Sequence, residues 1–369
     1  MAAEMHTLAE AARWYDAWLK EGALPLWGRA GVDPEQGFFH EALTAEGRPH
    51  IAPRRSRVQA RQVFVFSTCA KRDYGTALLP IAKRGFEGLV ASYRRPDGLF
   101  INSVSADGAP RDEGVDIYEQ AFALLAMAAL HAVDPSSGDL PKEAERTLRA
   151  LQDRRVAGGG FRESGAHPFQ ANCHMHLFES ALAWEEAGVA SWTALSDELA
   201  ALALGKFIDD ETGVLREFFD SEWRPLEGEG GLIEPGHHFE WAWLLERWGR
   251  ARGDGRARET ARRLYANGLR GVDAARQVAM NALWEDFSIR DANARLWPQT
   301  EHLKATLFFG DDSEILRAAQ GLAKYLDVPA RGAWRDKMQA DGSFLTEPSP
   351  ATSFYHLLTA VLELQTRKA

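Results

Sequence analysis

The segment Glu234-Pro-Gly-His-His-Phe-Glu-Trp-Ala-Trp-Leu-Leu-Glu-Arg-Trp248 is the most informative part of the 369-residue chain. Pro235 and Gly236 end the preceding segment, and the aromatic and aliphatic run that follows predicts a helix that begins inside the protein. At about 100° per residue, His237 and Glu240 lie on one face of this helix, and Trp243 lies one further turn along it. Taken alone, the pair is explained by a buried histidine that bonds to its helix neighbour. The surrounding sequence adds a second interpretation.

Apolar helices of this kind alternate with amphipathic ones along the chain. We predict apolar helices over residues 58–70, 116–133, 172–187, 237–248, 298–309 and 353–364, and amphipathic helices over residues 7–20, 75–93, 141–151, 191–207, 256–269 and 314–326. A helix that is apolar all round must be covered on every side, whereas an amphipathic helix can face water. The alternation therefore predicts an all-α fold, an (α/α)6 barrel with an apolar inner ring. An open solenoid would also alternate helices, but it needs no fully buried layer.

Short extended elements that contain a glycine precede these apolar helices. They begin at Gly37, Gly98, Gly160, Gly213 and Gly342, and we expect a degenerate copy between residues 271 and 287. We expect these elements to form short β-hairpins at the mouth of the barrel, into which the N-termini of the inner helices point. Helix N-termini favour oxygen-rich ligands. Residues 1–369 are expected to form one catalytic domain.

Composition excludes several classes of protein. The chain has 43 Lys and Arg against 53 Asp and Glu, a net charge of -10, and no basic run, which argues against nucleic acid as a partner. It lacks a signal peptide, and no apolar run reaches the roughly 18 residues that cross a bilayer. Cys69 and Cys173 have no CxxC partner, so we expect free thiols. A soluble cytoplasmic protein, monomeric or homodimeric, is expected.

Polar residues cluster at the start of each predicted apolar helix. They are Arg57 and Arg61; Asp116, Tyr118 and Gln120; Asn172, His174, His176 and Glu179; His237, His238 and Glu240; Trp297, Gln299, Glu301 and His302; Tyr355 and His356. Unpaired charge on a buried helix is costly, so a non-catalytic interaction solenoid would not carry these groups. Their shared position predicts one common cavity.

Residues 235–245 resemble the Gly-His-x-x-Glu-x-x-Trp-Leu signature of the N-acylglucosamine 2-epimerase superfamily, which contains sugar epimerases and aldose-ketose isomerases. Gln59-Ala-Arg61, the His-x-His-x-x-Glu of residues 174–179, Trp297-Pro-Gln-Thr-Glu301 and Tyr355-His356 are also similar to this family. The resemblance spans nearly the whole chain. It implies the six-fold α/α barrel, in agreement with the alternation of helices.

The resemblance also implies roles for individual residues. His237 and His356 would be the acid/base pair on opposite sides of the sugar, Arg61 would bind the oxygen that becomes anionic, and His176 would assist ring opening or proton relay. Substrate binding would fall to Glu240, Trp243, Trp297, Glu301, Asn172 and Tyr118, with the carboxylates orienting histidines and hydroxyls and the indoles forming walls. His356 precedes Leu357-Leu358, unlike the polar continuation of the disaccharide epimerases, which argues against a disaccharide substrate.

The residue types fit proton transfer at carbon 2 of an open-chain sugar. This reaction needs a base, an acid and a group that holds the enediolate oxygen. Histidine titrates near neutral pH and arginine stays charged. We predict a cofactor-free, metal-independent isomerase of mannose and fructose or a related pair. Alternatives are 2-epimerisation of a free monosaccharide such as glucose and mannose, and isomerisation of a phosphorylated or sulfonated hexose bound by Arg54, Arg55 and Arg57.

Two further enzyme classes use the same residue types. A metal enzyme is disfavoured because neighbouring histidines point apart on their helices, about 200° for His174 and His176 and about 100° for His237 and His238. An inverting glycoside hydrolase would use Glu240 and Glu301 as its carboxylate pair. The abundance of histidine counts against this second class.

Overall fold

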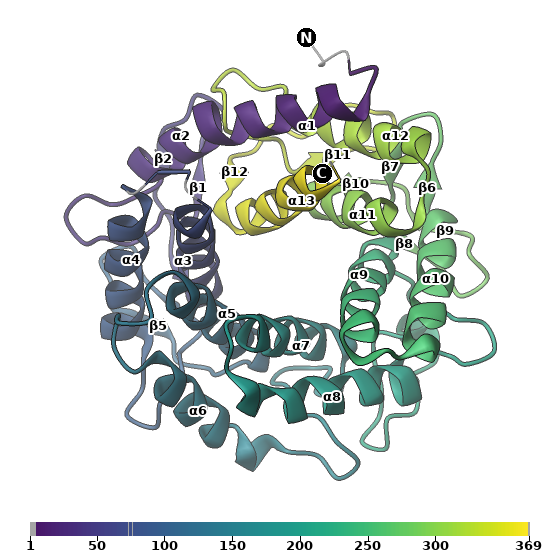
Figure 1. Cartoon of the computed structure of the whole chain (residues 1–369), viewed down its shortest axis with the longest axis horizontal. Helices are drawn as coiled ribbons and strands as arrows, with labels where there is room; N and C mark the ends of the chain where they lie inside the picture. The colour runs from purple at the N-terminus through teal and green to yellow at the C-terminus, as the bar shows by residue number, and fades with distance from the viewer. Residues whose placement is uncertain (1–4, 73, 76, 368–369) are drawn as a thin grey trace.

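The helices form two concentric rings in the computed structural model, which describes residues 5–72, 74–75 and 77–367 (Figure 1). The inner ring is made of α3 (Ser56–Lys71), α5 (Ile117–Val133), α7 (Ala171–Glu186), α9 (Pro235–Arg252), α11 (Leu296–Phe309) and α13 (Phe354–Thr366). The outer ring is made of α1 (Leu8–Ala17), α2 (Leu24–Arg29), α4 (Leu78–Tyr93), α6 (Leu140–Ala150), α8 (Thr193–Leu202), α10 (Gly255–Leu269) and α12 (Asp312–Ala323). Successive inner helices contact one another, and α13 returns to contact α3. The predicted (α/α)6 barrel is confirmed.

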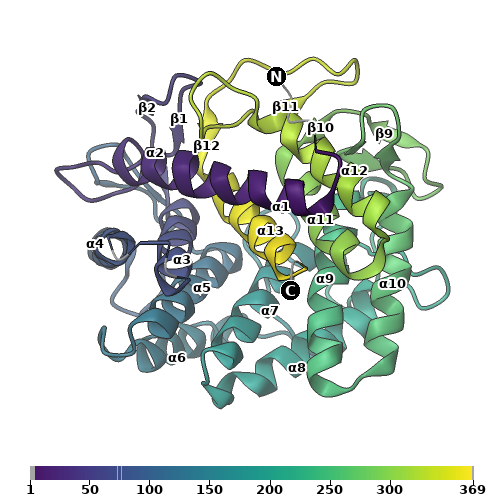
Figure 2. The same cartoon turned by 45° about the horizontal axis from the view of Figure 1, so that its top comes forward.

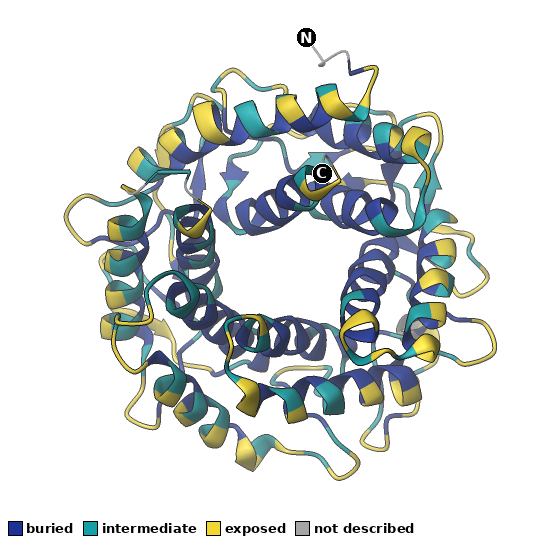
Figure 3. Cartoon of the chain, in the orientation of Figure 1, coloured by how far each residue is buried: buried dark blue, intermediate teal, exposed yellow. Residues whose placement is uncertain are grey.

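The two rings differ in burial as the sequence pattern requires. The inner helices are buried on nearly all sides, whereas the outer helices expose one face to water (Figure 3). In α5, for example, Phe122, Leu124 and Met127 are each 0% exposed. Trp27 of α2 stacks on Trp334 with ring centroids 4.6 Å apart and so ties the two ends of the chain together. No helix in the described part of the chain has the length and hydrophobicity that a bilayer crossing requires.

The first outer helix extends further than the predicted 7–20. After α1 the chain makes a π-helical turn, Trp18–Ala23, and then continues as α2 to Arg29. Pro25 lies in the first turn of α2 and cannot donate a backbone hydrogen bond. A wider π turn before it accommodates this loss, so the helix bends without ending.

Short antiparallel strands connect the helices at one end of the ring, several of which Figure 2 shows above it. They are β1 (Ala42–Leu43), β2 (Pro49–His50), β3 (Arg54–Arg55), β4 (Ser103–Val104), β5 (Pro110–Asp112), β6 (Val272–Asp273), β7 (Val278–Ala279), β8 (Ala282–Leu283), β9 (Ile289–Asp291), β10 (Ala294–Arg295), β11 (Lys337–Met338) and β12 (Ser349–Pro350). The sheets run β12-β1-β2, β3-β4-β5, β6-β7, β8-β9 and β10-β11. Ala42 pairs with Pro350, so the last unit closes against the first.

Repeated hydrogen bonds, here called the clasp, join five of the extended elements to the first turn of the inner helix that follows each of them. Gln59 of α3 accepts from the Phe39 N–H and donates to the Phe39 carbonyl, both at 2.8 Å. Gln120 binds Phe100 in the same way, and Gln299 binds Ala279. Histidines replace glutamine in two units, where His174 Nε2 accepts from the Phe161 N–H and His238 Nε2 from the Leu215 N–H. Part of the polar pattern at the helix starts is therefore structural.

The clasp also identifies the irregular fifth and sixth elements. The fifth element lies inside the predicted 271–287 region, where Gln277 takes the position that glycine holds elsewhere, with a φ of 59°. In the sixth unit the predicted Gly342 turns a hairpin in which Met338 pairs with Phe344, but it does not belong to the clasp. The equivalent glycine is Gly332, with a φ of 98°, followed by Trp334, whose N–H and carbonyl both bond to Ser349 Oγ. In this unit the clasp is made by a serine that precedes α13, whereas in other units it is made by a glutamine inside the helix. The spacing between the glycine and the start of the helix therefore differs.

The clasp predicts a stability effect. Gln120→Leu keeps the side-chain volume but leaves the buried N–H and carbonyl of Phe100 without partners. We expect the free energy of unfolding to fall by about 3 kcal/mol, because each unsatisfied buried group costs about 1–3 kcal/mol. Urea unfolding measures this change. The exposed Gln152→Leu is the matched control and should change stability by less than about 0.5 kcal/mol. Equal stability of the two variants would contradict the structural role of the clasp.

Candidate active site

A cavity of about 580 Å³ opens at the end of the barrel where the inner helices begin. Every inner helix contributes to its lining. The predicted site residues that line it are Arg61, Tyr118, Asn172, His176, His237, Glu240, Trp297 and His356. Residues 61 and 356 are separated by nearly the whole chain, and closure of the ring brings them together. Of the predicted site, Trp243 and Glu301 lie outside the lining.

His237 begins α9 beside two carboxylates. Its Nδ1 lies 3.0 Å from Glu217 Oε2 and 3.5 Å from Glu234 Oε2. Burial alone would lower the pKa of His237, but Glu217 and Glu234 outweigh it and raise the pKa to about 10. The ring is therefore an imidazolium at neutral pH. Because Nδ1–H is directed to Glu217, Nε2–H remains as the proton donor.

His356 has the opposite protonation state. Its Nδ1 lies 2.8 Å from Glu301 Oε1. Burial, together with the positive charges of Arg61 and Lys304, holds the pKa of His356 well below its ordinary range. A neutral ring that donates Nδ1–H to Glu301 keeps a free lone pair on Nε2. Two titratable groups with pKa values pushed in opposite directions form a matched acid and base.

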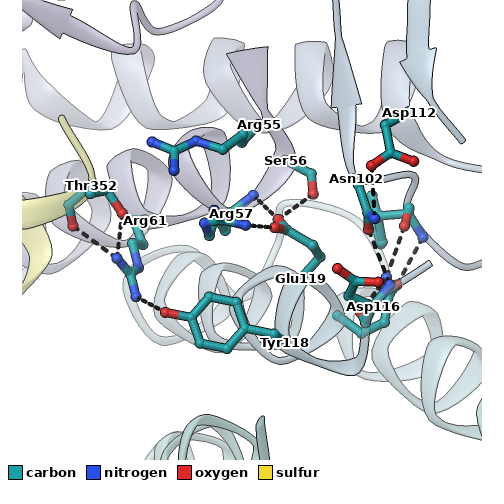
Figure 4. A network of polar contacts seen from close by, with 12 residues as sticks. Arg55, Ser56, Arg57, Arg61, Asn102, Asp112, Asp116, Tyr118, Glu119 and Thr352 are labelled. Atoms are coloured by element: carbon teal, nitrogen blue, oxygen red, sulfur yellow. Dashed lines mark hydrogen bonds and ion pairs between the residues drawn. The ribbon is translucent and has the colours of Figure 1, made fainter. Parts of the chain in front are cut away.

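Trp297 and Arg61 complete the surroundings of the two histidines. The Trp297 ring centroid lies 5.1 Å from that of His237 and 5.8 Å from that of His356. Arg61 donates from Nη2 to Tyr118 Oη at 2.9 Å and from Nη1 to Thr352 (Figure 4). Its guanidinium lies 3.9 Å from the centre of the Phe122 ring. It is buried and, within the described residues, forms no ion pair with a carboxylate. Its positive charge is available to an oxyanion.

His176 and Asn172 line the α7 side of the cavity. Burial lowers the pKa of His176 to about 4, against the pull of Glu179, so the imidazole is neutral. Its Nδ1 lies 3.5 Å from Glu179 and 3.8 Å from Glu240. The buried Oδ1 of Asn172 has no hydrogen-bond partner among the described residues. A bound hydroxyl can supply that partner.

Trp243, predicted as a substrate wall, does not line this cavity. This residue lies six positions after His237, which places it about 9 Å deeper along α9. It lines a second cavity of about 420 Å³, which α3, α5, α7, α9 and α13 also line further along the barrel. Its Nε1 donates to Glu363 at 3.1 Å.

Glu301, predicted to bind substrate, also does not line this cavity. Glu301 is 0% exposed and lies behind His356, to which one of its oxygens is bonded. Its other implied role, orienting a histidine, fits this position. That role acts through His356 without contact to the sugar.

Glu217 is a site residue that the sequence analysis missed. It ends the glycine element that begins at Gly213, and it bonds to His237, which lies 20 residues further on. Related glutamates end other elements. Glu163 accepts from the N–H groups of Ile117 and Tyr118 at the start of α5. The recurrence of glutamate three to five residues after Gly37, Gly160, Gly213 and Gly342 was the available signal.

The basic residues at the mouth are mostly neutralised. Arg54 pairs with Asp33, Arg55 with Glu41, Arg57 with Glu119 and Lys337 with Glu347. Figure 4 shows Arg57 beside Glu119, which also accepts from Ser56 Oγ at 2.6 Å. Of the described cations that line the cavity, Arg61 and Arg295 form no ion pair. The predicted anion-binding role of Arg54, Arg55 and Arg57 therefore finds no free charge, whereas Arg295 beside Trp297 keeps its charge available.

The structure also bears on the two competing enzyme classes. His176, Glu179 and Glu240 could together hold a metal ion, as could Glu240, Glu301 and His356, with donor atoms within 4.8 Å of one another. Each set combines residues from two or three helices, so the divergence of neighbouring histidines on one helix does not exclude them. For an inverting glycosidase, carboxyl groups about 6.5–9.5 Å apart are needed to admit water. Glu240 and Glu301 are closer and Glu301 does not reach the cavity, so this pair lacks the required geometry.

This chain is similar in sequence and in fold to several known proteins. The model of the N-acylglucosamine 2-epimerase (GlcNAc 2-epimerase) family matches residues 37–360. A mannose-6-phosphate isomerase of Rhizobium meliloti (strain 1021) is 44% identical over 94% of this chain and 95% of its own. The solved cellobiose 2-epimerase of Bacillus thermoamylovorans B4167 has a TM-score of 0.86 at 17% identity and covers 96% of this chain and 99% of its own. A D-mannose isomerase has a TM-score of 0.86 at 18% identity, covering 96% and 98%.

Proposed function

Because the chain belongs to the N-acylglucosamine 2-epimerase family, we propose that it is a mannose-type sugar isomerase that moves a proton between carbons 2 and 1 through an enediolate. The observation that carries the proposal is that one cavity contains a neutral His356, a cationic His237 and a buried Arg61 that has no carboxylate partner among the described residues. The likeness to a mannose-6-phosphate isomerase supports the same reaction type.

The chemistry follows from the protonation states. Nε2 of His356 removes the proton from carbon 2 of the open-chain aldose, and His237 gives its Nε2 proton to the carbonyl oxygen on carbon 1. Arg61 stabilises the negative charge that develops on the oxygens. His237 then recovers a proton from the hydroxyl on carbon 2, and His356 returns its proton to carbon 1. The product is the ketose, and both histidines regain their starting states.

Residues beside this pair are assigned supporting roles. Trp297 packs along one side of the sugar, Glu240, Asn172 and Tyr118 bind hydroxyls, and neutral His176 assists ring opening. Returning the proton to the other face of carbon 2 would instead give 2-epimerisation. We propose a single catalytic unit, monomeric or homodimeric, that needs no cofactor or metal ion. Its free, buried Cys69 and Cys173 suit a cytoplasmic location.

The proposed substrate is a neutral hexose such as mannose. Ion pairs at the mouth leave little free positive charge for a second anionic group. A phosphorylated hexose is the second candidate, because the 44% identical relative is a mannose-6-phosphate isomerase and Arg295 remains unpaired among the described residues.

If the phosphate group binds to Arg295, Arg295→Gln should raise KM for mannose 6-phosphate and leave KM for mannose unchanged.

Incubation with mannose in deuterated water with a chelator present tests the reaction. We expect fructose as product, with deuterium at carbon 1 because His356 exchanges its proton with solvent, as NMR would show. Glucose would instead support the epimerase. Turnover of mannose 6-phosphate alone would support the phosphorylated substrate. Loss of turnover with chelator, restored by a divalent metal, would contradict the metal-independent mechanism.

A further inference from the structure

Lys304 is a buried residue of α11 that does not line the active-site cavity and takes no part in the proposed proton transfers. It is 0% exposed, as is Glu301, one helical turn earlier on α11. Its Nζ lies 2.6 Å from Glu301 Oε2, close enough for an ion pair but not aligned as a hydrogen bond. A buried ammonium ion is costly unless its environment compensates for the charge. Its position therefore requires an explanation.

Buried carboxylates surround Lys304 from several helices. Glu301 comes from its own helix, Glu240 from α9 and Glu179 from α7, and all three raise the pKa of Lys304 although burial alone would lower it. From α13, Tyr355 donates to Glu179 and His356 bonds to Glu301. Burial, with the charge of Glu179, keeps the pKa of Glu301 above its ordinary value, and the charge of Lys304 reduces that rise. Lys304 is thus the cation that favours the ionised form of Glu301.

Trp243 covers the ammonium ion on another side. Lys304 Nζ lies 3.8 Å from the centre of its ring, within the range of a cation–π contact. The same indole lines the second cavity, which Lys304 does not reach. The ring therefore lies between the ammonium ion and the second cavity and shields the ion from water there. This contact gives Trp243 a role other than the predicted substrate wall.

We propose that Lys304 is a positioning residue for the isomerisation, whose charge keeps Glu301 an ionised acceptor for His356 Nδ1–H while Trp243 shields that charge. The inference rests on the proposed function, in which His356 Nε2 must be free of a proton. If Glu301 became a carboxylic acid, it would donate to Nδ1 and force the proton of the neutral imidazole onto Nε2. A histidine in that tautomer cannot remove the proton from carbon 2.

The test is ¹⁵N NMR of histidine-labelled full-length protein, with His356→Asn used to assign the signal, beside steady-state kinetics. In the wild type we expect the Nδ1–H tautomer of His356. In Lys304→Met we expect the Nε2–H tautomer or the imidazolium, with kcat reduced by at least about tenfold and KM nearly unchanged. Lys304→Arg restores the charge and should return part of kcat.

Two further variants separate positioning from stability. Arg252→Met removes the charge of a cluster with Glu185 and Asp197 at the far end of α9, and should lower stability without changing the tautomer or kcat. Trp243→Leu keeps the charges of Lys304 and Glu301 but removes the indole that shields them, so it should change the tautomer of His356 and kcat in the same direction by a smaller amount. This variant provides the test if Lys304→Met does not fold. A wild-type tautomer and kcat in the folded Lys304 or Trp243 variants would overturn the proposal. The NMR result stands even if the wild type turns over no mannose, so failure of the proposed function is recognised separately.

Discussion

His356→Asn is expected to lower kcat for hexose isomerisation by about 10³-fold or more, because it removes the base and asparagine cannot take its proton. His356 is the neutral imidazole of the cavity, held by Glu301 with Nε2 free. Asparagine retains a donor for Glu301, so the helix packing should persist. Exchange of the carbon 2 proton with deuterated water should be lost in parallel with turnover, which NMR measures directly.

The matched control is His131→Asn on α5. His131 is partly buried and packs against Trp184, but it does not line the cavity. We expect wild-type kcat and proton exchange for this variant. Thermal unfolding should show that both variants fold. Turnover of His356→Asn within a few-fold of wild type would remove His356 from the role of base and would point to His176 instead.

The ring of helices could be predicted because the burial of a helix follows from the spacing of apolar residues within that helix. An inner helix such as α5 is apolar on every side, and this property needs no knowledge of distant residues. The same holds for residues in the first turn of each inner helix. His237 and His356 occupy equivalent places in two repeats, so the fold that stacks the repeats also brings these histidines to one cavity.

Depth and distant partners could not be predicted in this way. Trp243 lies about 120° around α9 from His237 and about 9 Å further along it, so the turn and the rise of the helix carry it away from the mouth. Glu217 and Lys304 act across elements, since Glu217 reaches His237 from a preceding loop and Lys304 is surrounded by carboxylates of other helices. Their partners become visible only once the ring is closed.

Glu217→Gln is expected to move the alkaline limit of kcat/KM to lower pH by about 1–3 units, because it removes the carboxylate nearest to the His237 imidazolium. The sign follows from the raised pKa of His237, about 10. The acid form is present below this pKa and is lost as pH rises through it, so wild-type activity should persist to about pH 10. Without Glu217, burial lowers the pKa of His237, and only part of the opposing negative charge, that of Glu234 at 3.5 Å and of Glu240, remains.

The expected loss is largest above the new limit. Above both pKa values the rate should fall below wild type by the shift itself, about tenfold for one unit and about 1000-fold for three, after subtraction of the uncatalysed alkaline isomerisation of the sugar. At lower pH the two enzymes should converge, because His237 is then protonated in both. Glu222→Gln changes an exposed carboxylate in the same segment, paired with Arg224, and should leave the profile unchanged. An unshifted alkaline limit in Glu217→Gln would contradict the assignment of His237 as the group that supplies the catalytic proton, because Glu217 is the carboxylate nearest to its ring.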